Sequence, residues 1–535
     1  MKKTLFLWSL LGLLMLNIAW AQQKTILGTV LEETDSPLPG ATVIIDGTTQ
    51  GVSTDFDGNF SINATLGDVL VVSYVGYADQ RITVGAQDQY SINMQSDSEL
   101  DEVIVTALGI KREARSLGYS VKRVGSEEIE QKGQADVART LQGKVAGVNI
   151  TNTTATSGSG TNIVIRGMTS ITGSNQPLFI VDGVPFDAST PGGAFFNGIT
   201  QSSRFLDLDP NSIESVDILK GLSATVLYGQ QGRNGVILVT TKNGSSSQTQ
   251  KGMEATVSHS IFLNDPVLPD YQNDYGGGFH QLFGFFFSNG GPNFDPAIND
   301  PRQFGAYYRG EENGYVTVQH PLDRINDRTL VDPEFTELSL TNYPYKNYRP
   351  VENFFNQGIV HTTSLNLKST SDKGFLSLTY NRIDDEGFTP GNRLRKNNLG
   401  IGGRATLDNG LTIGGTLNYA NTDYITPPIA ASFGSGSSSS FTSSVFGDLM
   451  YTPRSVDLMG LPFQTSDGRS IYYRSGNDIQ NPRWTVANAF DSELVNRVFG
   501  NFNASYQIND QLGISYVYGL DASSQFAEHA QNKGG

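Results

Sequence analysis

The sequence predicts a mainly β protein with three successive parts: a small β-sandwich, a compact α/β domain, and the N-terminal part of a transmembrane antiparallel β-barrel. The chain has 535 residues, of which 59 are glycine and only 17% are charged. This composition favours strands and turns over helices. From residue 253 onward, apolar and polar residues alternate along strands whose connections are tight and long in turn, which is typical of a membrane barrel.

The first 21 residues predict an export signal peptide. Lys2 and Lys3 precede an apolar run over residues 5–18, and small residues then mark a cleavage site before Gln22. The run is shorter than the ~20 residues of a membrane-spanning helix. The net charge of -16 disfavours nucleic acid as a partner, because like charges repel. The absence of cysteine excludes disulfides, thiol nucleophiles and cysteine-ligated metals from this sequence.

Residues 22–97 predict the β-sandwich. Segments 25–30, 41–45 and 68–74 are strand-like, and clusters of Pro, Gly, Asp and Asn separate them. Short strands at this spacing are typical of a small sandwich.

Residues 98–118 predict a linker that carries one short β-prone peptide. The peptide consists of Glu102, Val103, Ile104, Val105 and Thr106, with flexible flanks. It is either an ordinary edge strand or a segment that adds to the sheet of a partner through backbone hydrogen bonds.

Residues 119–244 predict the α/β domain. Val137, Leu141 and Val145 have helical spacing and predict a helix over residues 135–145. We expect a second, short helix over residues 222–228. Strand-like runs occupy residues 147–150, 162–166, 178–183, 213–219 and 236–241.

Residues 245–535 predict barrel strands without a helical signal. We expect seven, near residues 254–263, 361–369, 374–382, 397–407, 411–420, 494–508 and 512–520. A soluble sandwich is the alternative, but it has no reason to alternate tight with long connections. Barrels that enclose a plug use ~22 strands. We therefore expect this sequence to be a fragment of a chain nearly twice as long.

No motif for catalysis, a cofactor or a metal is apparent, so we do not expect an enzyme. The sequence contains no Gly-x-Ser-x-Gly, His-Glu-x-x-His or Walker loop, and its five histidines are scattered. Asp384, Asp385 and Glu386 are adjacent, which favours a solvated turn in a polar loop over a pair of catalytic carboxylates.

Two groups of motifs carry a resemblance to known families. Segments 28–30, 39–43, 51–60 and 73–77 resemble the carboxypeptidase-regulatory-like domain, a transthyretin-like sandwich. Segments 166–170, 177–185, 209–221 and 224–244 resemble the plug of TonB-dependent transporters, and the Val-Asp-Gly-Val-Pro form resembles the SusC/RagA class in particular. The matching plug positions include Arg166, Gly167, Asp182, Gly183, Pro185, Gly232, Arg233 and Gly235.

The resemblance implies an integral outer-membrane importer whose N-terminal domain and TonB box are periplasmic. Residues 102–106 would be the TonB box, which pairs with TonB and receives energy from the inner-membrane proton motive force. The resemblance also implies a SusD-like surface lipoprotein as partner, with oligosaccharides or peptides as substrates. A secreted enzyme and a surface adhesin or glycan-binding protein without transport are the alternatives.

Loops over residues 264–360 and 421–494 are rich in Gly, Phe and Tyr. Their aromatic side chains have three interpretations that the sequence leaves open. The three interpretations are stacking on sugars, a girdle at the membrane interface, and packing of loop against loop.

Overall fold

The computed structural model describes most of the chain. The described residues are 24–32, 36–48, 50–74, 77, 79–94, 103–105, 111–113, 121–130, 134–152, 154, 156–171, 173–189, 202–220, 226–244, 251–286, 288–326, 335–429, 444–473, 480–509 and 511–534. The expected signal peptide, residues 1–21, lies outside them. The chain divides into two compact units: residues 1–104 with 111–117, and residues 105–110 with 118–535.

The first unit contains the expected β-sandwich. One sheet has the order β4-β1-β7 and the other β3-β2-β5-β6. The strands are β1 (Lys24–Glu32), β2 (Thr42–Ile45), β3 (Gly51–Ser53), β4 (Asn59–Ala64), β5 (Val69–Ser73), β6 (Gln80–Thr83) and β7 (Gln89–Met94). Alternate residues of β4 and β7 are buried, so Phe60, Ile62, Tyr90 and Ile92 fill the space between the sheets.

The second unit begins with the α/β domain. Its main sheet has the order β10-β15-β16-β13-β14, and β11 and β12 form a hairpin beside it. The strands are β10 (Val121–Gly125), β11 (Val148–Asn152), β12 (Thr161–Ile165), β13 (Leu178–Val181), β14 (Val184–Phe186), β15 (Ile213–Leu219) and β16 (Val236–Thr241). The helices are α2 (Ser126–Glu130), α3 (Val137–Thr140), η4 (Arg204–Asp207), η5 (Pro210–Ser212) and η6 (Val226–Asn234).

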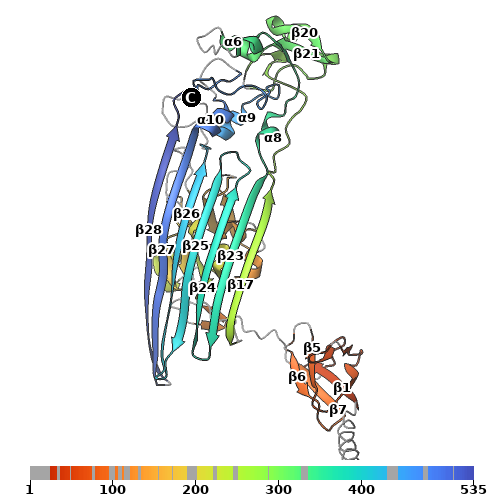
Figure 1. Ribbon diagram of the computed structural model, residues 1–535, viewed down its shortest axis with the longest axis vertical. Helices are drawn as coiled ribbons and strands as arrows, with labels where there is room; N and C mark the ends of the chain where they lie inside the picture. Colours follow the sequence, from red (N-terminus) through yellow and green to blue (C-terminus); the bar gives the residue numbers. More distant parts are fainter. Residues whose placement is uncertain are drawn as a thin grey trace, which may run out of the picture. The chain divides into compact units, whose positions relative to one another are not determined.

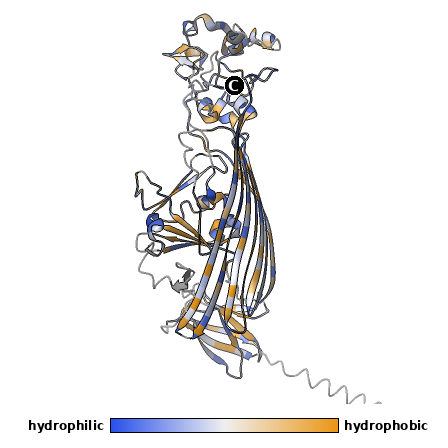
Figure 2. Ribbon diagram, turned by 90° about the vertical axis from the view of Figure 1, so that its left-hand side faces the viewer, coloured by the Kyte–Doolittle hydropathy of each residue, from blue (hydrophilic) through white to orange (hydrophobic). Residues whose placement is uncertain are grey.

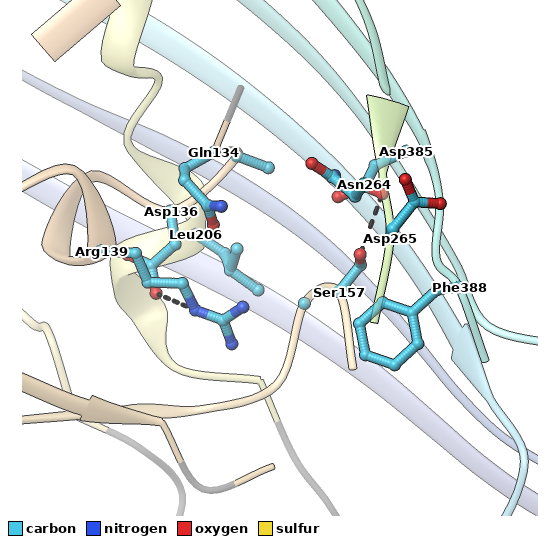
Figure 3. Close-up of a pocket in the computed structure, with 11 residues that line it drawn as sticks. Gln134, Asp136, Arg139, Ser157, Leu206, Asn264, Asp265, Asp385 and Phe388 are labelled. Atoms are coloured by element: carbon cyan, nitrogen blue, oxygen red, sulfur yellow. Dashed lines mark hydrogen bonds and ion pairs between the residues drawn. The ribbon is translucent and has the colours of Figure 1, made fainter. Parts of the chain in front are cut away.

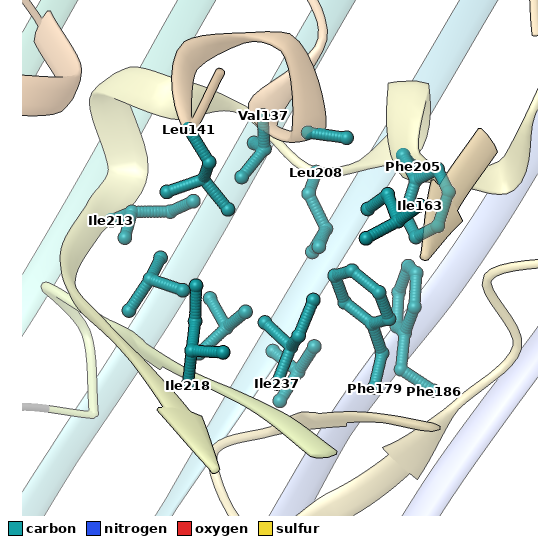
Figure 4. Close-up of a cluster of buried hydrophobic side chains, with 14 of the residues drawn as sticks. Val137, Leu141, Ile163, Phe179, Phe186, Phe205, Leu208, Ile213, Ile218 and Ile237 are labelled. Carbon is teal, nitrogen blue, oxygen red and sulfur yellow. The ribbon is translucent and has the colours of Figure 1, made fainter. Parts of the chain in front are cut away.

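An apolar core holds this domain together. Val137 and Leu141 pack onto Phe179, Ile218 and other strand residues (Figure 4). The helix expected over residues 135–145 is shorter than predicted, because α3 ends at Thr140 and turns follow to residue 145. Leu141 and Val145 are nevertheless buried, so the apolar spacing marked the core correctly even where the backbone leaves the helix.

The barrel region forms one seven-stranded antiparallel sheet in sequence order, from β17 to β28 (Figure 1). Its strands are β17 (Gly252–Asn264), β23 (Gly358–Ser371), β24 (Gly374–Glu386), β25 (Arg393–Thr406), β26 (Leu411–Thr426), β27 (Ala489–Asn509) and β28 (Leu512–Gln531). Tight turns follow β23, β25 and β27. The expected mainly β fold with a partial barrel is confirmed.

The two faces of this sheet differ as the alternation predicts. On β24, Leu376 and Leu378 are exposed, while Ser377 and Thr379 are buried under the α/β domain. The hydropathy colouring in Figure 2 shows the alternation along the strands. A polar inner face and an apolar outer face are the pattern of a barrel that encloses a plug in a membrane.

The expectation of a solvated turn at residues 384–386 is wrong. Asp384, Asp385 and Glu386 continue β24, and Asp385 is buried because it points inward. Polar residues can extend a barrel strand at its rim, because neither face there meets hydrocarbon.

The long connections contain secondary structure that the sequence did not indicate. They carry β18 (Gly278–Phe279), β19 (Leu282–Phe283), η7 (Pro296–Ile298), η8 (Pro301–Gln303), η9 (Gly305–Tyr307), β20 (Tyr308–Glu312), β21 (Tyr315–Gln319), α6 (Pro321–Asn326), α7 (Thr336–Ser339), β22 (Asn342–Pro344), α8 (Pro350–Phe354), α9 (Val445–Met450) and α10 (Pro482–Asn488). These helices are too short for a clear helical period. None of the helices in the described residues is long and apolar enough to cross a membrane.

Candidate functional site

The α/β domain lies against the inner face of the barrel sheet, and its β13–β14 hairpin makes one of the main contacts. Asp182 and Gly183 form the hairpin turn with φ angles of 47° and 86°. The Asp182 carboxylate accepts hydrogen bonds from the backbone N–H and the hydroxyl of Thr241, at 2.8 and 2.7 Å. Burial raises the pKa of Asp182, and these hydrogen bonds oppose that rise. The side chain therefore fixes a turn that most residues would avoid.

This turn presents the hairpin to β27. The carbonyl oxygen of Asp182 accepts a hydrogen bond from the side-chain amide of Asn501 at 2.5 Å. Phe186, which follows Pro185 on β14, meets the ring of Phe499 edge-on, with 5.2 Å between ring centroids. The Val-Asp-Gly-Val-Pro motif thus shapes a hairpin that contacts the barrel wall.

The other expected plug residues fall into two groups. Gly235 has a φ of 99°, and an added Cβ would lie 2.7 Å from the side chain of Ile165, so glycine is required there. Gly167 has a φ of 96°, and Gly232 is buried within η6. Arg166 and Arg233 are exposed. The assignment of all these plug positions to a functional site stays a prediction.

Buried ion pairs join η4 to the barrel strand β27, and we call these four residues the plug lock: Arg204, Asp207, Glu493 and Arg497. Each is at most 4% exposed. Arg204 pairs with Glu493, and Arg497 donates to Asp207 at 3.1 Å. Charged groups buried at this depth are costly unless they are paired, so each partner holds the other in place.

Strand β28 and the plug hairpin extend this network. Arg497 also donates two hydrogen bonds to Asp521, at 2.7 and 2.5 Å, and its guanidinium lies 3.5 Å from the ring centre of Phe186. The backbone N–H of Asp187 donates to Asp521 at 3.1 Å. Arg497 is therefore the residue at which η4, the β13–β14 hairpin and two barrel strands meet.

A buried lysine on β25 binds the backbone of the α/β domain at two separate points. Lys396 Nζ donates to the carbonyl oxygens of Ala135 and Leu208, at 2.8 and 2.9 Å, and the side chain is fully buried. Its neighbour Asn398 donates to the carbonyl oxygen of Asp207 at 3.0 Å. Burial raises the pKa of Asp209 nearby, while the positive charge of Lys396 counteracts the rise.

A cavity of about 200 Å³ opens at the long-loop end of this interface (Figure 3). Asp136, Arg139 and Ser157 line it from the plug side, and Asp385 of β24 and Asp265, which follows β17, line it from the barrel side. The Ser157 hydroxyl donates to Asp385 at 2.9 Å. The wall and the plug also come very close here, because a Cβ on Gly158 would lie 2.5 Å from the ring of Tyr424.

The proposed partner-binding peptide is only partly described. Val103, Ile104 and Val105 form β8, which pairs with β9 (Lys111–Glu113) in a two-stranded sheet. Glu102 and Thr106 lie outside the described residues. Among the described residues, no group of three His, Asp or Glu side chains is placed to hold a metal ion.

The loop aromatics pack against one another. Phe283, Phe304, Tyr343 and Tyr345 belong to one buried cluster that also includes residues from both long loops. Arg454 supports it from the second loop through an ion pair with Glu352 at 2.5 Å. Of the three interpretations that the sequence left open, packing of loop against loop is the one that these side chains adopt.

The sequence patterns did not indicate the plug lock or Lys396. The sequence did contain a hint of them. Lys396, Glu493 and Arg497 lie at inward positions of strands with an apolar–polar alternation, and a buried charge at such a position requires a partner. The partners Arg204 and Asp207 lie in a segment without a strong periodic pattern, so the sequence alone did not connect them.

Comparisons with known proteins agree with this architecture. Residues 26–105 match the CarboxypepD_reg-like domain family, and residues 113–236 match the TonB-dependent Receptor Plug Domain family. TonB-dependent receptor P26 of Formosa agariphila is 41% identical over 247 residues, which are 46% of this chain and 23% of that protein. TonB-dependent receptor SusC of Bacteroides thetaiotaomicron is 38% identical over 254 residues, which are 46% of this chain and 24% of that protein.

The fold is also similar to a solved structure, that of the RagAB peptide importer in its open-open state. The TM-score is 0.53 at 18% identity, over 80% of this chain and 43% of that one. This chain therefore spans less than half the length of the relatives it matches. A regulatory-like sandwich, a plug and barrel strands in this order, together with these matches, support a TonB-dependent receptor of the SusC/RagA class.

Proposed function

We propose that this chain is the N-terminal region of a TonB-dependent importer in the outer membrane, with no enzymatic activity. The observation that carries the proposal is the plug lock, in which buried charges of η4 pair with inward charges of β27. A plug held in this way closes the lumen until a force displaces it. The proposed domain limits are 1–21, 22–97, 98–118, 119–244 and 245–535.

The force would arrive through the TonB box, residues 102–106. In a two-stranded sheet each strand has one unpaired edge, and an unpaired edge accepts a further strand through its backbone groups. The pairing of β8 with β9 thus leaves β8 one edge for TonB. Energy from the inner-membrane proton motive force would then pull on the plug from the periplasm.

The chemistry of the interface supports a plug that moves. Several buried polar atoms at the interface have no hydrogen-bond partner among the described residues: Asp209 Oδ2, Asn243 Oδ1, Asn398 Oδ1, Thr416 Oγ1 and Asn418 Nδ2. Water satisfies such groups readily. Separating these polar contacts in the presence of water costs less than exposing an equal apolar area. The interface also contains an apolar cluster, in which Ala135 and Leu206 pack against wall residues that include Tyr424.

The proposed substrates are oligosaccharides or peptides, and the proposed partner is a SusD-like lipoprotein at the extracellular mouth. The packed loops, which rise from the end of the barrel opposite its tight turns, offer a structured surface for such a partner. RagAB is described as a peptide importer, which supports peptides as one of the two substrate classes.

Uptake by cells that express the full-length gene tests this proposal. Proline at Val103 or at Val105 should abolish TonB-dependent uptake of an oligosaccharide or peptide while substrate binding persists, because proline removes a backbone donor. Testing both positions covers either pairing register. Ile104→Ser is the matched control, since it keeps the backbone donor and should be milder. Normal uptake in both proline variants would remove the peptide from the mechanism, and binding without any transport would favour an adhesin.

A further inference from the structure

The outer face of the barrel sheet changes character along β24 and β25. Leu376, Leu378 and Tyr380 point outward on β24 and are 37–59% exposed, and Leu399 and Ile401 do the same on β25. Toward the long-loop end, the outward positions carry charged side chains on β24, and on β25 Asn397 is followed by two arginines. Cross-strand pairs place Asp384 beside Arg395 and Glu386 beside Arg393.

These charged residues line a groove of about 280 Å³ on the outer face. Its polar lining consists of His361, Arg382, Asp384, Glu386, Arg393 and Arg395. We call it the arginine groove. All of these side chains come from β23, β24 and β25, and they face away from the plug, so a substrate inside the lumen would not meet them.

The ion pairs in the groove leave one guanidinium nitrogen without an acceptor within the described part of the chain. Asp384 is shared between Arg382, at 2.8 Å, and Arg395, at 3.1 Å. Three arginines and two carboxylates line the groove, and Asp423 is the cross-strand neighbour of Arg395 on β26. Arg393 Nε is out of contact with solvent and has no hydrogen-bond partner among the described residues. A buried guanidinium donor without an acceptor is a site that favours an oxyanion.

The position of the arginine groove along the barrel strands indicates which kind of molecule it would meet. The apolar band of a membrane barrel is about 25 Å tall, and a strand tilted by about 40° rises about 2.6 Å per residue along the membrane normal. The band therefore takes about ten residues. Counted from the tight-turn end of β24 at Gly374, it ends near Asp384. The arginine groove thus lies where hydrocarbon gives way to lipid headgroups.

We propose that the arginine groove binds the phosphate of a lipid headgroup in the outer leaflet. The inference rests on the proposed outer-membrane location. The phosphate would accept hydrogen bonds from Arg393 and Arg395, and the acyl chains of the same lipid would lie over Leu378, Leu399 and their apolar neighbours. A soluble phosphate could use the arginines but gains nothing from this apolar surface, which is why a lipid is favoured.

Binding of purified full-length receptor to two matched lipids tests the proposal. The probes are lipid A with its phosphate and the same lipid A after phosphatase treatment, each titrated into delipidated receptor in neutral detergent and counted by native mass spectrometry. The receptor should bind one phosphorylated lipid at least tenfold more tightly than the dephosphorylated one. Arg393→Gln and Arg395→Gln should abolish this preference. Arg404→Gln, an exposed position near the tight-turn end of β25, should keep it.

Equal binding of the two lipids by the unmodified receptor would overturn the proposal. Competition by inorganic phosphate at the same concentration as the lipid would also overturn it, because the site would then recognise a soluble anion. Both outcomes leave the uptake experiment unaffected. Conversely, a receptor that fails to fractionate with the outer membrane would contradict the proposed function itself.

Discussion

Replacing Arg497 with glutamine is expected to loosen the plug from the barrel wall. Arg497 is 1% exposed and neutralises Asp207, which is fully buried. The Arg497→Gln change leaves the Asp207 carboxylate with the Thr422 hydroxyl at 3.3 Å and with one cation, Arg204, whose guanidinium is 3.8 Å away and is already paired with Glu493. The same change removes both hydrogen bonds to Asp521 and the contact with Phe186.

The magnitude follows from the cost of an uncompensated buried charge. Removing one partner of a buried ion pair costs about 3–5 kcal/mol. Even the lower value corresponds to roughly a hundredfold increase in the population of the undocked plug, since 1.4 kcal/mol is about a factor of ten. The undocked population should increase less when Asp207→Asn accompanies Arg497→Gln, because the double variant leaves no unpaired carboxylate at position 207.

Cysteine labelling measures this population directly. These 535 residues contain no cysteine, so Ser203→Cys introduces a single reporter within this region of the receptor. Ser203 is fully buried next to the lock, and its hydroxyl has no hydrogen-bond partner among the described residues, so the change disturbs little. The labelling rate by a maleimide should rise roughly a hundredfold with Arg497→Gln.

Arg404→Gln serves as the control for loss of a positive charge, because Arg404 is exposed and should leave the rate unchanged. Each variant must first reach the outer membrane in normal amount. A labelling rate within twofold of the parent in a correctly inserted Arg497→Gln receptor would show that the lock does not hold the plug.

Three further outcomes are expected. Gly158→Val should push the plug away from the ring of Tyr424 and raise the same labelling rate, since overpacking costs about 1–3 kcal/mol; an unchanged rate would contradict the close contact. Burial raises the pKa of Asp448 to about 8, so the folded loops keep a proton that the unfolded segment loses near pH 4. Loop stability should therefore fall as the pH rises from about 4 to about 8, and Asp448→Asn should remove this dependence in hydrogen exchange measured across that range. N-terminal sequencing of the outer-membrane protein should begin at Gln22, and retention of Met1 would refute signal cleavage.

Local patterns explain which parts of the fold were predictable. The alternation of Leu376, Ser377, Leu378 and Thr379 has a period of two, so it predicted both the strand and its two faces. Apolar spacing likewise marked Val137 and Leu141 as core although the helix ends between them. These signals act over a few residues, and the sequence contains them directly.

The lock and the loop core depend on contacts between distant segments. Arg204 and Glu493 are separated by 289 positions in the sequence, so no local pattern relates them. Phe283 and Tyr472 share one buried cluster although they belong to different loops. In short irregular segments an aromatic residue has the same local signature whether it binds a ligand or fills a core, and only the fold distinguishes the two.

The distribution of polar and apolar contacts indicates how the proposed plug movement would begin. The apolar core of the plug is nearly self-contained: among the described residues, Ala420 and Phe499 are its only members from the barrel strands. The lock and Lys396 connect the plug to the wall through charges and hydrogen bonds, and a smaller apolar cluster that includes Leu206 and Tyr424 also joins the two. Ion pairs lose their strength once water reaches them, because the surrounding dielectric constant rises. A pull transmitted from the periplasm should therefore break the plug–wall contacts before it unfolds the plug core, so that the lumen opens while most of the apolar packing of the plug persists.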